Sequence, residues 1–175
     1  LFGRGVDSEA VETGVVAQTM YGREGGRIQI KGIGVGERFN YAAAEAEQGT
    51  PVGYVGGGDQ REGWRAEHYP SVDYVCVKRA ISHTCAESIS PQAAQNAIRS
   101  AATAAVQRAR QVTTTRLSAP YEMQLQASKP VLADLFSLIP GVTRIDAVTV
   151  GYRADQMATL ISLLSAFSYL ASTQS

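Results

Sequence analysis

Segments with the two-residue period of a β-strand alternate with segments that have helical spacing along most of this chain. Strands are expected at 27–31, 52–55, 72–78, 121–127 and 145–152. Helices are expected at 37–48, 60–69, 91–112 and 131–139, and from Asp155 onward. Such alternation predicts an α/β chain in which helices cover a mixed sheet, with a smaller β-α-β-α subdomain at the carboxyl-terminal end.

Two helices carry an apolar stripe that predicts which of their faces is buried. Before the first of them, Ser90 and Pro91 form the hydroxyl-then-proline pair that favours a helix start. Its stripe consists of Ile98, Ala101, Ala102, Ala105, Ala109 and Val112. The stripe of the last helix consists of Met157, Leu160, Ile161, Leu164 and Phe167, widened by Leu163 and Leu170.

The polar stretch at 113–120 is the predicted seam of the chain. It separates a larger α/β part, 1–112, from a smaller β-α-β-α part, 121–175. Because the connections are short, the two parts can equally form one continuous domain.

Charge and composition exclude several classes of function. The chain of 175 residues has 16 basic and 16 acidic side chains, so its net charge of zero favours neither nucleic acid nor an acidic membrane as partner. No run reaches the roughly 18 apolar residues of a spanning helix, and the first twenty residues do not resemble an export signal. With two cysteines, Cys76 and Cys85, we expect a reducing, cytoplasmic location.

Two weak patterns leave other chemistry open. Two glycine clusters could form a phosphate-binding loop, but neither has the full dinucleotide-binding spacing. The first consists of Gly32, Gly34 and Gly36, and the second of Gly53, Gly56, Gly57 and Gly58. His83 and Cys85 could form a thiol–imidazole pair, although the sequence supplies no orienting acid for it. Nucleotide binding and thiol catalysis are therefore kept as minor alternatives.

Seven short motifs occur in a fixed order between Thr13 and Ala171, and their order is more specific than any one of them. They are Gln18–Gly22, Val35–Glu37, Val52–Asp59, Val77–Ser82, Ser88–Pro91, Ile139–Val142 and Arg153–Met157. The series resembles the carboxyl-terminal two thirds of the zinc D-aminopeptidase family, the metallopeptidases of the dipeptide-transport-operon type.

This resemblance implies a metallopeptidase fold with two zinc ions held by carboxylates and histidines. The metals would activate a water for hydrolysis of short peptides that have an amino-terminal D-residue. The resemblance also implies ring-like homo-oligomers, with neither nucleic acid nor membrane as a partner.

The site of this chain departs from the family pattern at two positions. Asp7 stands where the family has a ligand histidine, and Gln18 stands where it has its catalytic histidine, whereas Glu37 is kept. The family's amino-terminal D-x-E-G strand is absent from the sequence. The resemblance thus implies Asp7 and Glu37 as metal ligands, with Gln18 at the catalytic position.

We therefore expect a family member with an incomplete or degenerate site. The chain is then either a fragment that lacks an amino-terminal metal-binding part or a relative that has lost catalysis. The alternative is a non-catalytic α/β module that binds peptides or forms oligomers.

Overall fold

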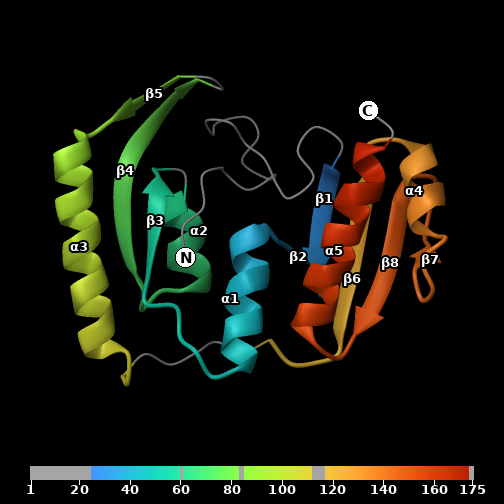
Figure 1. The fold of residues 1–175 in the computed structure, drawn as a ribbon, viewed down its shortest axis with the longest axis horizontal. Helices are drawn as coiled ribbons and strands as arrows, with labels where there is room; N and C mark the ends of the chain where they lie inside the picture. The colour runs from blue at the N-terminus through green and yellow to red at the C-terminus, as the bar shows by residue number, and fades with distance from the viewer. Residues whose placement is uncertain (1–24, 60, 83–84, 112–116, 174–175) are drawn as a thin grey trace. The chain divides into compact units, whose positions relative to one another are not determined.

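The computed structural model describes residues 25–59, 61–82, 85–111 and 117–173 (Figure 1). The described residues group into two compact units. The first unit comprises 45–59, 61–82 and 85–111, and the second comprises 25–44 and 117–173. The second unit thus takes residues from both sides of the polar stretch at 113–120. A division into domains at 1–112 and 121–175 stays a prediction.

The second unit is built on a five-stranded antiparallel sheet in the order β2-β1-β6-β8-β7. Its strands are β1 (Gly25–Ile30), β2 (Ile33–Gly34), β6 (Tyr121–Ala127), β7 (Thr143–Arg144) and β8 (Thr149–Ala154). Along β6, buried and exposed residues alternate strictly. One face of this sheet is therefore covered, as the period of two at 121–127 predicts.

Two helices cover that face. α4 (Pro130–Phe136) packs against β6 and β8, and α5 (Met157–Ser172) packs against β8 and α4. The rings of Phe136 and Phe167 stack with centroids 4.3 Å apart. The buried residues of α5 are Met157, Leu160, Leu163, Leu164, Phe167 and Ala171, whereas Ile161 and Leu170 are half-buried. The predicted apolar stripe of the last helix is thus largely confirmed.

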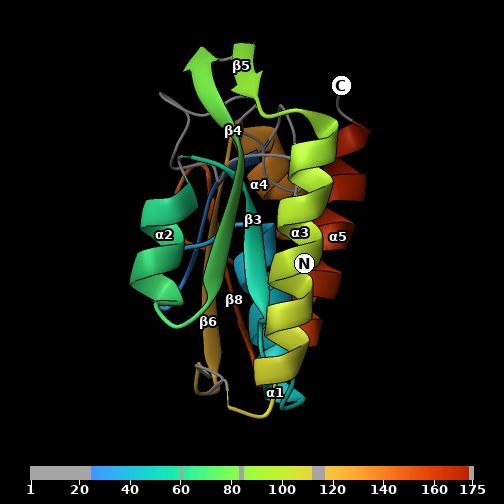
Figure 2. The same cartoon turned by 90° about the vertical axis from the view of Figure 1, so that its left-hand side faces the viewer.

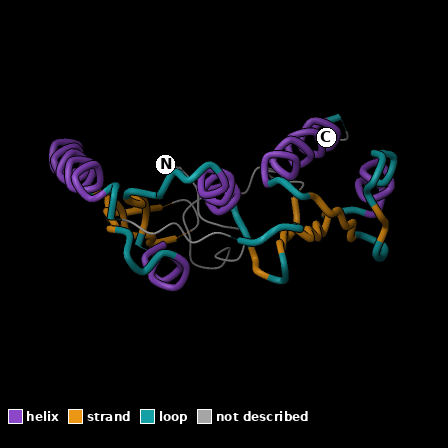
Figure 3. Tube along the Cα trace, turned by 90° about the horizontal axis from the view of Figure 1, so that it is seen from below, coloured by secondary structure: helices purple, strands orange, loops and turns teal. Residues whose placement is uncertain are grey.

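The first unit contains a mixed three-stranded sheet in the order β3-β4-β5. β3 (Tyr54–Gly58) runs parallel to β4 (Asp73–Ser82), and β4 pairs antiparallel with β5 (Cys85–Ser88). α2 (Arg61–His68) joins the parallel pair, and α3 (Pro91–Arg108) follows β5. Figures 2 and 3 show α2 and α3 on opposite faces of the sheet. The predicted α/β class, with strands and helices in alternation, is confirmed.

Three strand predictions need correction. β3 begins two residues later than expected and includes the glycines at 56–58, because the ladder with β4 holds them in extended backbone. β5 was not expected; it forms because β4 continues to Ser82 and residues 85–88 pair antiparallel with the last part of that strand. β8 begins at Thr149 rather than Ile145, because the backbone N–H of Ile145 donates to the Thr149 carbonyl and closes a turn.

The predicted face of α3 lies toward the sheet, but it is less deeply buried than expected. Ala105 is the buried residue of this helix, Ile98, Ala101 and Ala102 are half-buried, and Ala109 after its last turn is exposed. Val112 lies outside the described residues. The physical reason is that, among the described elements, α3 packs mainly against β3 and β4 of a three-stranded sheet. The predicted start of the helix is confirmed, since the Ser90 hydroxyl accepts from the Ala93 N–H at 3.2 Å.

None of the described helices is both long and apolar enough to cross a membrane.

Candidate functional site

The candidate site is at the start of α1 (Glu37–Glu47), where a tight hairpin leads into the helix. β1 and β2 are joined by a two-residue turn in which Lys31 and Gly32 both have positive φ, 53° and 77°. Positive φ at both positions is typical of the turn that matches strand twist. The Val35 N–H then donates to the Ile28 carbonyl at 3.0 Å, so the residues just before α1 are tied to the sheet.

Glu37 is the first residue of α1, as the helix prediction for 37–48 expects. An acidic residue in the first turn of a helix interacts favourably with the unpaired backbone N–H groups there. The Asn40 N–H donates to the Gly36 carbonyl at 3.3 Å, which closes the first turn on the buried Gly36. The second unit therefore places Glu37 at a backbone position that the sheet holds in place.

α1 also carries a buried polar residue that the sequence analysis did not single out. Asn40 is 1% exposed, and neither its Nδ2 nor its Oδ1 has a hydrogen-bond partner in the described part of the chain. Leaving a buried polar group unpaired costs about 1–3 kcal/mol. The available signal was an amide that directly follows Phe39 and precedes Tyr41 and Ala42, one helical turn after Glu37.

The structure brings no pair of the predicted site residues together within the residues it describes. Glu37 is placed at the start of α1, and the predictions for Asp7 and Gln18 lie outside the described residues. Among the described residues, no three His, Cys, Asp or Glu side chains form a group that could hold a metal ion. Since a catalytic zinc usually has three protein ligands, these residues by themselves do not make a zinc site.

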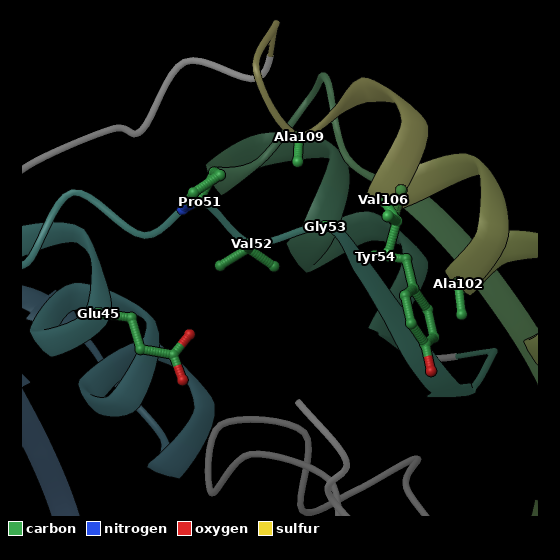
Figure 4. A pocket seen from close by; sticks show the side chains of 9 residues that line it. Glu45, Pro51, Val52, Gly53, Tyr54, Ala102, Val106 and Ala109 are labelled. Atoms are coloured by element: carbon green, nitrogen blue, oxygen red, sulfur yellow. The ribbon is translucent and has the colours of Figure 1, made fainter.

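A separate cavity of about 280 Å³ lies in the first unit (Figure 4). The helix α3 contributes Ala102, Ala105 and Val106 to its wall, and Ala109 follows directly after the helix. The opposite wall consists of Pro51, Val52 and Gly53, which lead into β3, and of Tyr54, its first residue. Glu45 supplies the charged group among its lining residues.

Tyr69, which is not among these lining residues, has a perturbed pKa. Its burial and, to a smaller extent, the nearby charge of Glu45 raise the pKa of the phenol to about 12.

The described fold gives little support to the two minor alternatives, thiol catalysis and nucleotide binding. Cys76 and Cys85 are free and exposed, and His83 lies outside the described residues. The glycines at 56–58 belong to β3, and the Lys78 side chain runs alongside Gly58. A strand in that position does not form the open loop that a phosphate-binding site needs.

Comparisons with known proteins agree with the motif order. The model of a peptidase family described as D-aminopeptidase (M55) matches residues 5–166. The solved structure of the Zn-dependent D-aminopeptidase DppA from Bacillus subtilis, described as a self-compartmentalizing protease, matches with a TM-score of 0.85 and 22% identity. That alignment covers 97% of this chain and 61% of the other, so the chain spans about three fifths of that protein's length. No curated protein sequence matches the chain.

Proposed function

Because the chain belongs to the D-aminopeptidase family, we propose that its ligands are short peptides with an amino-terminal D-residue and that its zinc site is incomplete or degenerate, so that this chain by itself does not hydrolyse them efficiently. The observation that carries the proposal is the family match over 5–166 together with Glu37, retained at the start of α1, two residues after the Val35 N–H that donates to the sheet. The fold likeness to a Zn-dependent D-aminopeptidase supports the same choice of chemistry.

In this proposal Asp7 and Glu37 are metal ligands, and Gln18 lies beside the substrate. Zinc, where bound, polarises the peptide carbonyl and lowers the pKa of a water. Carboxylates are suitable zinc ligands, but two of them are fewer than the three protein ligands that a catalytic zinc usually has. Gln18 has an amide that can donate and accept hydrogen bonds but cannot act as a general base.

The substitution at Gln18 favours a second candidate function. A family member that keeps a peptide-binding surface without the catalytic base would bind D-peptides and not hydrolyse them.

The solved structure of DppA is described as that of a self-compartmentalizing protease, which supports the proposal that this chain forms a ring-like homo-oligomer. Light scattering of the purified chain measures its molar mass; a mass of about 18.6 kDa would contradict the ring.

The first experiment measures zinc by atomic absorption in the chain purified without chelator, followed by zinc titration and release of amino-terminal D-alanine. Glu37→Gln should lower the bound zinc. The matched control is Glu62→Gln, which removes an exposed acid from the first turn of α2 and so causes the same loss at a helix start. Control and wild type should bind equal amounts of zinc.

The results separate the two candidate functions. Stoichiometric zinc with hydrolysis supports a working peptidase, and would contradict a degenerate site. Peptide binding without turnover supports the non-catalytic reading. If the chain binds no zinc and no peptide, the proposed function is wrong.

A further inference from the structure

Two of the described residues have buried side-chain polar atoms without a hydrogen-bond partner: Asn40, through Nδ2 and Oδ1, and Arg65, through Nε alone. Asn40, which is 1% exposed, is the fully buried one of the two, and both polar atoms of its amide are unpaired within that part of the chain. Protein interiors rarely leave such groups without partners, and each exception calls for a structural or functional cause. The arrangement differs from that of Asn96, the other asparagine of the chain, whose exposed amide bonds to Gln92 and Arg99.

The position of Asn40 links it to the candidate site. It lies one turn after Glu37 on α1, and residues three apart on a helix are neighbours on its surface. At a spacing of 100° per residue, Phe39, Ala42 and Ala46 mark the centre of the buried face. Asn40 lies at the edge of that face on the side toward Glu37. Asn40 is thus a buried polar residue next to Glu37, the proposed metal ligand at the start of α1.

The chemistry of the unpaired amide defines what would satisfy it. Nδ2 donates and Oδ1 accepts, so the best partner offers one acceptor and one donor side by side. The carbonyl oxygen and the N–H of a single residue in an extended peptide point to the same side and meet that need. A fold keeps a costly unpaired group at a functional position when another state, such as a bound one, supplies its partners.

We propose that Asn40 is a peptide-binding residue of the site at the start of α1. Its Nδ2 donates to a carbonyl oxygen of the bound peptide, and its Oδ1 accepts from an N–H of the same residue. Because Asn40 is buried in the unliganded chain, binding includes a local movement that lets the peptide reach it. The inference rests on the proposed function, since it deepens the substrate recognition of that same site.

The test replaces the amide by an apolar group of similar shape, Asn40→Leu, and measures stability and peptide binding together. Removal of an unpaired buried amide should leave the thermal unfolding midpoint unchanged or raised. Affinity for a dipeptide with amino-terminal D-alanine, measured by calorimetry, should fall about tenfold or more. Asn96→Leu is the matched control and should leave both quantities near those of the wild type.

Asn40→Ala is the second variant, in case leucine does not fit. It should lose affinity in the same way, because it also lacks donor and acceptor. Unchanged affinity in a folded Asn40→Leu would overturn the inference and leave the proposed function standing. A large fall in the unfolding midpoint of both variants would also overturn it, because the amide would then be paired within the folded chain, for instance by a buried water.

Peptide binding by the wild type is measured in the same series. If the wild type binds no D-peptide, the inference and the peptide specificity of the proposed function both fail. Zinc content is recorded for each variant and should not change in Asn40→Leu. A loss of affinity that merely followed a loss of zinc would contradict a direct peptide contact.

Discussion

Helices α3 and α5 are of similar length, 18 and 16 residues, yet different interactions stabilise them. α5 buries six residues against the five-stranded sheet and α4, whereas α3 buries Ala105. α3 instead begins with a capped first turn and is rich in alanine. Alanine content and capping favour a helix locally, and burial favours it through tertiary packing. Similar helices can therefore depend on different parts of the sequence.

The largest effect should come from the core under α5. Phe167 is 0% exposed and stacks on Phe136, so Phe167→Ala removes a ring from close packing. We expect a loss of about 3–5 kcal/mol in the free energy of unfolding, measured with denaturant. Tyr169→Ala on the same helix is the control, because its side chain is mostly exposed, and it should cost less than about 0.5 kcal/mol. Equal losses would contradict the buried face of α5.

The next effect concerns a close approach between α3 and the residues that lead into β3. A Cβ built on Gly53 would lie 2.9 Å from the Ala105 Cβ, which is too close for two carbon atoms. Gly53→Ala should therefore cost about 1–3 kcal/mol in the free energy of unfolding. The same change at Gly63 in α2 meets nothing within 4 Å and should stabilise the helix by about 0.5–1 kcal/mol.

A double variant identifies the contact. Combining Gly53→Ala with Ala105→Gly removes the opposing Cβ, so the two changes should couple by roughly 0.5 kcal/mol or more. Strictly additive effects would show that α3 does not press on Gly53.

A smaller effect tests the local stabilisation of α3. Ser90→Ala removes the hydroxyl that accepts from the Ala93 N–H at 3.2 Å, and should cost about 1 kcal/mol. Ser100→Ala, on an exposed position of the same helix, should be neutral or slightly stabilising because alanine is the better helix former. Circular dichroism during urea unfolding measures both. No difference between the two variants would mean that the cap contributes nothing to α3.

The smallest effect concerns pH and a local turn of the second unit. Backbone N–H groups of Val148 and Thr149 donate to Asp146 Oδ1, both at 2.8 Å, and the hydrogen bond from Val148 is the main cause of a lowered Asp146 pKa. A lowered pKa stabilises the fold above the ordinary carboxyl value of about 4, and this contribution is lost as pH falls below it.

Asp146→Asn should therefore lower the unfolding midpoint at pH 6 and lose that difference as the pH falls below about 4. Asp155→Asn, which removes an exposed carboxylate of the same unit, is the control measured alongside it. A difference from the wild type that stayed constant with pH would contradict the Asp146 hydrogen bonds.

The fold could be predicted where the local signal and the tertiary environment agree. β6 has the expected bounds because strict alternation suits a sheet covered on one face. The start of α3 was predictable because Ser90 and Pro91 act within one turn. The strand through glycines 56–58 was not, because glycine disfavours strands locally and only pairing with β4 overrides that preference.

The candidate site was predictable from sequence only in part. Glu37 was identified by its motif, and the structure puts it where the helix was expected to begin. Asn40 was missed because an asparagine in a helix is usually exposed, and burial of its amide depends on packing around α1.

The sequence by itself determined the alternating α/β pattern, the helix starts and the family of this protein, because these depend on spacing, capping and motif order along the chain. Tertiary structure alone decided that two sheets form, that α5 is buried while α3 is largely exposed, and that Asn40 is enclosed without a described partner. The physical reason is that burial is a property of neighbours in space, and a stripe of apolar residues does not specify how much surface will cover it.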